Sequence, residues 1–176
     1  DEKVWMGMDK GRYGFYDKKK DTTIIKEIPS VSRTTEFRSI AGTKDAIFIL
    51  AVGNPAMLIR IDKKTLEETV VYKEEHEKVF YDSMQFVDDL NGFAMGDPIE
   101  NCLAFIKTTD GGKTWQKVNC DVLPKVAEGE AAFATSNTNL TIKEKSIFMV
   151  SGGKKSRVFV SNDIGATWNV YETPIV

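Results

Sequence analysis

The chain has 176 residues, of which 41% are hydrophobic and 28% are charged, a composition typical of a globular protein that buries a core. Its 24 basic and 26 acidic side chains leave a formal net charge of -2, which excludes a broad positive surface for binding nucleic acid. No apolar run reaches the roughly 18 residues of a membrane-spanning helix, so we expect no membrane insertion.

Short strands separated by polar turns recur along the chain in four units. Each complete unit is expected to contain four strands, A to D, and the units span about 1–29, 36–73, 80–120 and 129–173. An aspartate in the turn between strands C and D marks the repeat. These aspartates, spaced by 45, 48 and 53 residues, are Asp17, Asp62, Asp110 and Asp163. The period and the strand count are typical of a β-propeller, whose blades are four-stranded antiparallel sheets.

The first unit lacks strand A, the strand nearest the axis of a propeller. It begins with an expected strand B at 4–7, whereas strand A of the later units is expected at 37–42, 81–87 and 130–134. A missing inner strand leaves an open sheet edge, which closed propellers avoid. The sequence therefore predicts an all-β fold in a single domain, 1–176, that supplies about four blades, the first incomplete, of a larger propeller.

Two of the turns between strands C and D share a longer pattern, TTDGGKTW and SNDIGATW. In such a turn the aspartate accepts backbone N–H groups, the glycine takes a positive φ and the tryptophan covers the core. We therefore predict structural hairpins rather than active-site loops. The residues of the pattern are Thr108, Asp110, Gly112, Thr114 and Trp115, and Ser161, Asp163, Gly165, Thr167 and Trp168. The pattern resembles the Asp box, or BNR repeat, of sialidase-like propellers.

The two cysteines, Cys102 and Cys120, are too few for a disulfide scaffold and too widely spaced for a CxxC metal or redox motif. A hairpin turn near Gly111 brings them face to face across strands C and D. Two interpretations remain open: a disulfide, which an oxidising compartment favours, and two small buried thiols.

Most of the chain, from about residue 35 to residue 176, resembles exported bacterial propellers of the Bacteroidetes. Those proteins are loosely labelled oxidoreductases and are related to photosystem II stability and assembly factors. The segments that carry the resemblance are FRSI at 37–40, FYDSMQF at 80–86, GFAMGDPI at 92–99, TTDGGKTW, GEAAFATSNTN at 129–139 and VSGG at 150–153. The resemblance implies an export signal, a periplasmic, cell-surface or secreted location, and about twice this length in the complete protein. No GxGxxG, CxxC or haem motif supports the oxidoreductase label.

Alternation of strand direction puts the loops from B to C and from D to the next A on one face, called the upper face below. The Asp boxes lie on the opposite, lower face. Polar residues at the upper ends of the inner strands are expected to ring the axis. These candidate ligand-binding residues are Arg38, Asp82 and Glu130 at matching positions of strand A, Asn54 and Asp97 in the GNP and GDP loops, and Asn137. Their oxygens suit hydroxyl-rich ligands or a hard cation such as calcium, and no other cofactor or metal is expected.

Three functions follow for the upper face. The preferred one is an exported module that binds a glycan or a partner protein. The alternative is a glycoside hydrolase, sialidase-like or xyloglucanase-like, in which Asp82, Asp97 and Glu130 are the candidate catalytic residues because paired carboxylates do acid/base work on glycosidic bonds. The third is docking of a partner protein, by analogy with the assembly factors. A structural interpretation, in which Arg38 and Asp82 form an ion pair beside a wet channel, remains open, and so does the question of enzymatic activity.

Overall fold

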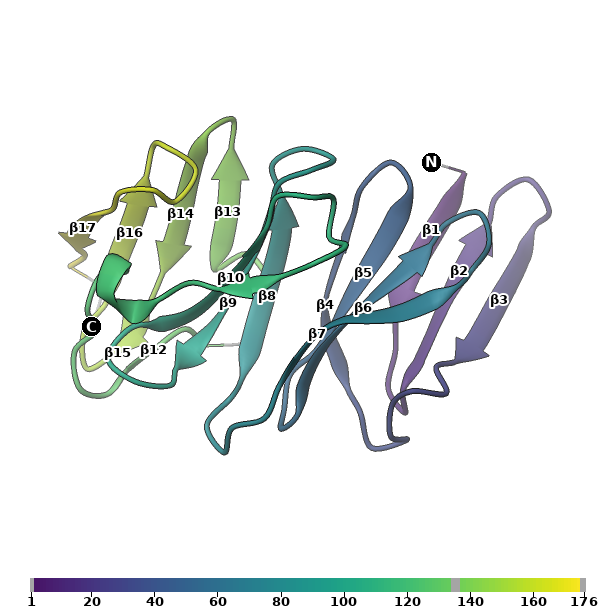
Figure 1. Ribbon diagram of the computed structural model, residues 1–176, viewed down its shortest axis with the longest axis horizontal. Helices are drawn as coiled ribbons and strands as arrows, with labels where there is room; N and C mark the ends of the chain where they lie inside the picture. The colour runs from purple at the N-terminus through teal and green to yellow at the C-terminus, as the bar shows by residue number, and fades with distance from the viewer. Residues whose placement is uncertain (1, 134–136, 175–176) are drawn as a thin grey trace.

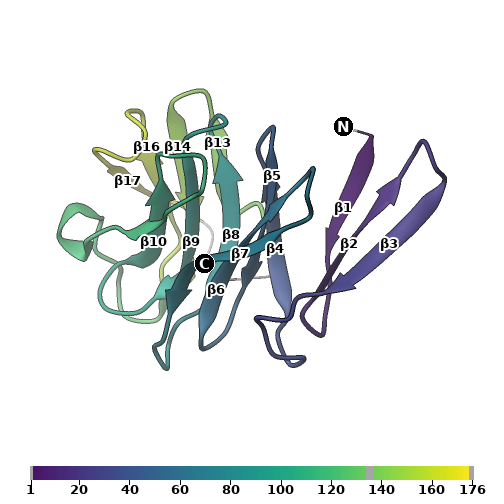
Figure 2. The same cartoon turned by 45° about the vertical axis from the view of Figure 1, so that its right-hand side comes forward.

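The computed structural model describes residues 2–133 and 137–174, and this part of the chain is built mainly of antiparallel β-strands. The strands form one three-stranded sheet, three four-stranded sheets and a two-stranded pair. The sheets stand side by side like blades, with the N-terminal and C-terminal sheets at opposite ends (Figure 1, Figure 2). No helix in the described ranges is long and apolar enough to cross a membrane. The arrangement confirms the predicted all-β architecture of propeller blades.

The strands follow one another in order from the inner to the outer edge of each sheet. The first sheet consists of β1 (Lys3–Gly7), β2 (Arg12–Asp17) and β3 (Thr22–Glu27). The second consists of β4 (Phe37–Gly42), β5 (Ala46–Ala51), β6 (Ala56–Asp62) and β7 (Glu68–Glu74). The third consists of β8 (Tyr81–Phe86), β9 (Gly92–Pro98), β10 (Leu103–Thr108) and β11 (Gln116–Lys117), followed by the 3-10 turn η1 (Cys120–Val122). The fourth consists of β13 (Leu140–Lys143), β14 (Ser146–Val150), β16 (Arg157–Ser161) and β17 (Asn169–Glu172).

The inner strands of neighbouring sheets meet. β4 contacts β8, and β8 contacts β13, while β1 of the incomplete first sheet contacts β4. The first sheet has three strands because the strand that would lie inside β1 is missing from it, as the sequence predicts. The upper ends of β4, β8 and β13 therefore come together, and the residues at those ends form the region of interest.

Apolar side chains fill the spaces between successive sheets. The main members are Tyr13, Ile49 and Ile59 between the first and second sheets, Phe48, Tyr81 and Trp115 between the second and third, and Phe93, Phe105 and Phe159 between the third and fourth. All six residues of β5 are buried because both faces of the second sheet are covered. Each large side chain that is fully buried contributes about 1.5–3 kcal/mol, so the packing between blades holds the sheets in place.

The turns between strands C and D are built around the repeating aspartates. Oδ1 of Asp17 accepts hydrogen bonds from the backbone N–H groups two and three residues later, at 3.0 and 3.2 Å. Oδ1 of Asp62 accepts the corresponding two bonds, both at 2.9 Å. A carboxylate at this position satisfies N–H groups that the turn leaves without a ladder partner. The same residue type therefore makes the same local structure in the units that lack the tryptophan pattern.

The inner strand of the fourth unit differs from the expectation. Strand A is expected as one strand at 130–134, but β12 (Glu130–Ala131) ends after two residues and the strand resumes in β13. β12 pairs with β15 (Gly152–Gly153), while β13 pairs with β14. Two short strands thus stand where one is expected; the remainder of the expected strand, residue 134, lies outside the described residues. Apolar alternation alone does not reveal such an interruption.

Candidate functional site

Two large cavities lined by described residues open on the upper face, in the loops that join one strand or sheet to the next. The first, of about 580 Å³, lies between loop 30–36 and loop 51–55. The second, of about 630 Å³, lies between residues 97–101 and 126–131. Each is bounded by a loop from D to A and by a loop from B to C. The first combines the loop before the second sheet with a loop of that sheet, and the second combines a loop of the third sheet with the loop that follows it.

The two cavities differ in their chemistry. The polar side chains in the lining of the first carry mainly hydroxyl and amide groups: Ser30, Ser32, Thr34, Thr35 and Asn54. Those in the lining of the second are mainly carboxylates, Asp97, Glu100, Glu128 and Glu130, with one basic residue, Lys78. The second cavity is therefore the more electronegative of the two.

Arg38 and Asp82 occupy matching places near the start of their inner strands. In β4 the pairing with β5 shifts register across Arg38, and in β8 the pairing with β9 shifts across Asp82. Such a β-bulge leaves the extra residue without a ladder partner and re-aims its side chain. Both side chains therefore depart from the regular alternation of side chains along a strand, at matching positions of the two sheets.

Asp82 is buried without a hydrogen-bond partner. The residue is 2% exposed, and neither of its carboxylate oxygens has a partner in the described part of the chain. Burial, followed by the negative charge of Asp97, raises the pKa of Asp82 to about 7, against the opposing effect of Arg38. The guanidinium of Arg38 lies 3.7 Å from the carboxylate of Glu36 and is partly exposed. Buried polar groups normally have partners, so Asp82 is the strongest candidate on this face for contact with a ligand.

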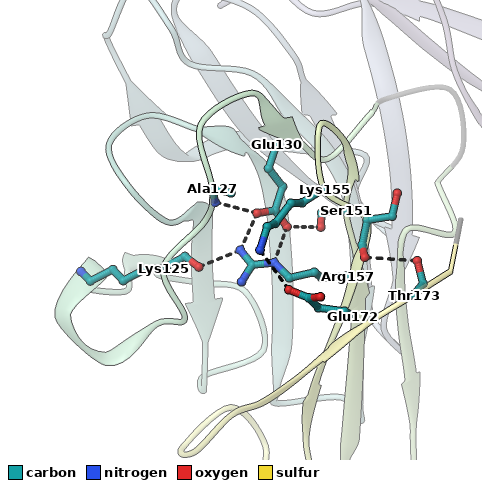
Figure 3. A network of polar contacts seen from close by, with 9 residues as sticks. Lys125, Ala127, Glu130, Ser151, Lys155, Arg157, Glu172 and Thr173 are labelled. Carbon is teal, nitrogen blue, oxygen red and sulfur yellow. Dashed lines mark hydrogen bonds and ion pairs between the residues drawn. The ribbon is translucent and has the colours of Figure 1, made fainter. Parts of the chain in front are cut away.

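Glu130, in contrast, is fully engaged. The guanidinium of Arg157 contacts both oxygens of its buried carboxylate, Ser151 donates its hydroxyl, and the backbone N–H of Ala127 donates at 2.7 Å (Figure 3). Arg157 also donates to the backbone carbonyl of Lys125 at 2.8 Å. Burial opposes ionisation of Glu130, but these hydrogen bonds outweigh it and hold the pKa of Glu130 below its ordinary value. The carboxylate thus anchors the loop before β12.

The pairing register separates Glu130 from the other strand A candidates. Thr108 and Ser161 hold the same place in the Asp boxes of the third and fourth units. When the strand pairing is followed from these two residues to the inner strand, the residue of the fourth unit that matches Asp82 is Thr138. Glu130 pairs with Gly153, beyond that level. The interruption of strand A produces this offset, which sequence alignment of the units does not show.

Asn54 and Asp97 are also not equivalent, although both stand between glycine and proline. Asp97 belongs to β9, next to the bulge of the inner strand, and its Oδ1 accepts the backbone N–H of Ala132 at 2.8 Å. Asn54 lies beyond the end of β5, is exposed, and lines the first cavity. The difference arises because β9 continues past its glycine, whereas β5 stops before Gly53.

Two asparagines of the fourth unit bind the inner strands of the second and third units. Ser39 Oγ donates to Asn137 Oδ1 at 2.7 Å, and Ser83 Oγ donates to Asn139 Oδ1. Both serines are buried, and Asn139 Nδ2 donates to the carbonyl of Ala132 at 3.1 Å. The side-chain oxygen of Asn137 is therefore used within the protein, where it ties blades together near the axis.

The first Asp box satisfies its own polar groups. Asp110 Oδ1 accepts the N–H groups of Lys113 and Thr114, both at 3.0 Å, and Oδ2 accepts the hydroxyl of Thr114. Thr108 Oγ1 accepts the N–H of Gly112 at 3.0 Å. Burial alone would raise the pKa of Asp110, but the hydrogen bonds outweigh it and lower this pKa to about 2. The loop is a closed local unit.

The second Asp box repeats this pattern. Asp163 accepts the N–H of Thr167 at 2.8 Å and its hydroxyl, and Ser161 Oγ accepts the N–H of Gly165 at 2.7 Å. The hydrogen bonds, led by those from Thr167, lower the pKa of Asp163 to about 2. The two tryptophans pack edge-on against core rings, at centroid distances of 5.7 Å each: Trp115 on Phe86 and Trp168 on Phe105.

Cys102 and Cys120 form a disulfide, with their Cα atoms 5.7 Å apart. Cys102 precedes β10, and Cys120 begins the turn after β11. The bond therefore closes the upper end of the outer strands of the third sheet. Of the two interpretations that the sequence leaves open, the structure contains the disulfide.

Sequence reasoning missed the residues that hold Glu130. Arg157 lies on strand C, which the repeat places in the outer part of the blade, yet its long side chain reaches back to the inner strand. Ser151 stands between β14 and β15, in a segment that looks like an ordinary turn. No grouping of three or more His, Cys, Asp or Glu side chains suited to a metal ion occurs in residues 2–133 and 137–174.

No family model matches the chain, and no curated protein sequence matches it. Chains of known structure do match, 83 in all. One of them, described as "YCF48 bound to D1 peptide", superimposes with a TM-score of 0.64 at 13% sequence identity, over 98% of this chain and 51% of that chain. The protein thus spans about half the length of that solved chain. At this level of identity the likeness shows a common propeller fold.

Proposed function

We propose that the protein is a binding module that engages an extended segment of a partner protein across its upper face. The observation that carries the proposal is the pair of cavities, of about 580 and 630 Å³, on that one face. The polar residues at the upper ends of the inner strands belong to the same face. Peptide recognition commonly combines pockets for individual side chains with polar groups that orient the backbone. The upper face offers both.

Two further findings support this choice. The solved propeller of similar fold has a peptide bound, according to its description, so a chain of this architecture accepts such a ligand. The disulfide between Cys102 and Cys120 supports the accompanying proposal that the protein is exported, because disulfides persist in oxidising compartments. Segments of partner proteins in the cell envelope or outside the cell are therefore the expected ligands.

A glycan is the second candidate ligand, and the first cavity is the observation in its favour. Hydroxyl and amide side chains, which donate to and accept from sugar hydroxyls, line that cavity: Ser30, Ser32, Thr34, Thr35 and Asn54. Cleavage of a glycan would use Asp82, which has the raised pKa of a general acid, together with Asp97. A glycosidic oxygen lies between two sugar rings and does not fit against a carboxylate that is 2% exposed. Binding is therefore favoured over catalysis.

The proposal is tested by binding to an array of random heptapeptides and to an array of oligosaccharides. Ser32→Trp fills the first cavity and Glu128→Trp fills the second, since both residues are exposed in the cavity linings. Each variant is expected to weaken binding of selected peptides about tenfold or more while the unfolding free energy stays within about 0.5 kcal/mol of wild type. Lys64→Trp, in an exposed turn on the lower face, is the matched control and should bind as wild type does.

The outcomes separate the candidate functions. Peptide binding that both cavity variants weaken supports the proposal. Binding of oligosaccharides alone, weakened by Ser32→Trp, favours the glycan. Peptide binding that survives both variants, or is weakened by Lys64→Trp, moves the site away from the upper face.

A further inference from the structure

Near the start of the inner strand β8, at the upper face, lies a carboxylate that has no hydrogen-bond partner among the described residues. Asp82 is 2% exposed, and neither oxygen has a hydrogen-bond partner in the described residues. An unpaired buried charge costs several kcal/mol, whereas one that is paired and hydrogen-bonded costs much less. The carboxylates of Asp110, Asp163 and Glu130, in contrast, each accept several hydrogen bonds. Asp82 therefore has an unused capacity to accept hydrogen bonds from a cation.

The charged neighbours of Asp82 leave that capacity open. Arg38, on β4, is the nearby cation, but its guanidinium lies 3.7 Å from Glu36 and its side chain is 47% exposed, so water screens its charge. Asp97, on β9, adds a second negative charge. Glu130, on β12, is already neutralised by Arg157. The balance of charge around Asp82 therefore favours an additional cation.

Asp97 connects this buried carboxylate to the second cavity. The backbone N–H of Asp97 donates to the carbonyl of Phe80 at 2.8 Å, which holds β9 against the start of β8, and the side chain of Asp97 lines the cavity. Glu100 and Glu128 add negative charge to the same lining. An electronegative hollow attracts positive charge. Asp82 is buried and is not itself part of this lining, so a ligand that reaches it past Asp97 must carry its charge on a slender stem.

We propose that Asp82 and Asp97 bind the positively charged side chain of a lysine or arginine in the partner segment. This inference rests on the proposed function and specifies the chemistry of its ligand. A lysine ammonium or an arginine guanidinium donates to two carboxylates at once and carries its charge at the end of a flexible apolar stem. Calcium prefers six to eight oxygen ligands, and no grouping of three or more acidic side chains suited to a metal occurs in the described ranges. The site therefore selects an organic cation.

A consequence of this site is that binding depends on pH. Asp82 binds a cation only when it is ionised, and its pKa in the free protein is about 7. The change in affinity therefore follows the ionisation of Asp82. Affinity for a basic peptide is expected to rise between pH 6 and pH 8, and the bound cation is expected to lower the pKa of Asp82.

The test compares peptides that differ in one charge. Heptapeptides with a fixed central lysine, and the same peptides with Nε-acetyl-lysine, are titrated by fluorescence anisotropy at pH 8. Wild type is expected to prefer the lysine peptides about tenfold or more, because a charge-assisted pair is lost on acetylation. Asp82→Asn should abolish the preference while retaining the affinity for the acetylated peptides. Arg38→Gln should strengthen lysine binding by removing a competing cation, and Glu67→Gln, an exposed acidic residue of the lower face, should change nothing.

Equal binding of the two peptide sets by wild type, or a preference that survives Asp82→Asn, overturns the inference and leaves the proposed function intact. If no heptapeptide binds, the proposed function is refuted. A second measurement then still tests whether Asp82 binds a cation. The carboxyl carbon of Asp82 is followed by 13C NMR while Nα-acetyl-lysine methylamide or calcium chloride is added. A downward shift of the titration midpoint with the lysine derivative supports the inference. A shift with calcium alone, or with neither, refutes it.

Discussion

Asp82 and Asp110 lie in the same blade, at opposite ends, and their carboxyl groups behave in opposite ways. Asp110 receives donors from its own turn, and its pKa falls to about 2. Asp82 is buried without a donor beside a second carboxylate, and its pKa rises to about 7. The chemistry of the side chain is identical, so the difference comes from the surroundings. A carboxylate that its own loop satisfies has a lowered pKa, and one that the fold leaves unsatisfied has a raised pKa.

Glu130 shows what a partner does for a buried carboxylate at the upper end. Like Asp82 it is almost completely buried, but Arg157, Ser151 and a backbone N–H surround it. Three substitutions test this comparison of the acidic residues. One removes the partner of Glu130, one removes the charge of Asp82, and one removes hydrogen bonds in the turn of Asp110.

The largest effect is expected when Glu130 loses its cation. Arg157→Met leaves a buried charge unpaired, and it should lower the free energy of unfolding by about 3–5 kcal/mol at pH 7. Urea unfolding monitored by tryptophan fluorescence measures this change. The double variant Glu130→Gln with Arg157→Met removes both charges and should be more stable than Arg157→Met alone. A double variant no better than the single one would show that packing of the Arg157 side chain, rather than charge, stabilises this end.

Removing the charge of Asp82 should stabilise the protein. The pKa of this group is higher in the folded state, about 7, than in the unfolded chain, about 3.9, so the folded state binds more protons between these values. The contribution of Asp82 to the stability of wild type therefore falls as pH rises from about 4 to about 7. Asp82→Asn should abolish that fall and raise the free energy of unfolding by about 2–4 kcal/mol at pH 8. A variant that is less stable than wild type at pH 8 would mean that Asp82 has an unseen partner.

The smallest effect is expected in the turn. Asp110→Asn keeps one acceptor oxygen but loses the charge and the bond from the Thr114 hydroxyl, so it should cost about 1–2 kcal/mol at pH 7. The pKa of Asp110 is lowered in the folded state, so its contribution is present above about pH 4 and is lost as pH falls toward 2. Wild type and variant should therefore converge at pH 2. Peptide binding should not change, and a loss of binding in a folded variant would give the lower face a role in recognition.

Much of the fold can be predicted from particular residues. The recurring turn aspartates and the strands between them indicate four units, and the first unit lacks its inner strand in the structure as in the sequence. The prediction was wrong for the inner strand of the fourth unit, where β12 and β13 replace one strand. Local alternation of apolar residues is compatible with either arrangement, and only pairing with β14 and β15 distinguishes them.

The candidate site was less predictable for a related reason. The repeat indicates that Arg38, Asp82 and Glu130 belong at the upper end, but it places them at one level and does not say which of them are paired. Arg157 comes from a distant strand to neutralise Glu130, whereas Arg38 leaves Asp82 unpaired. Pairing of this kind depends on side chains that are far apart in the chain.

The sequence by itself determined the period of the blades, the turns and their internal hydrogen bonds, because an aspartate in a tight turn meets donors within a few residues of its own position. The tertiary structure decided the register of the inner strands, the closed network around Glu130 and the isolation of Asp82. These features depend on which distant groups reach a buried carboxylate and on how much water remains beside it, and burial together with neighbouring charge sets the pKa.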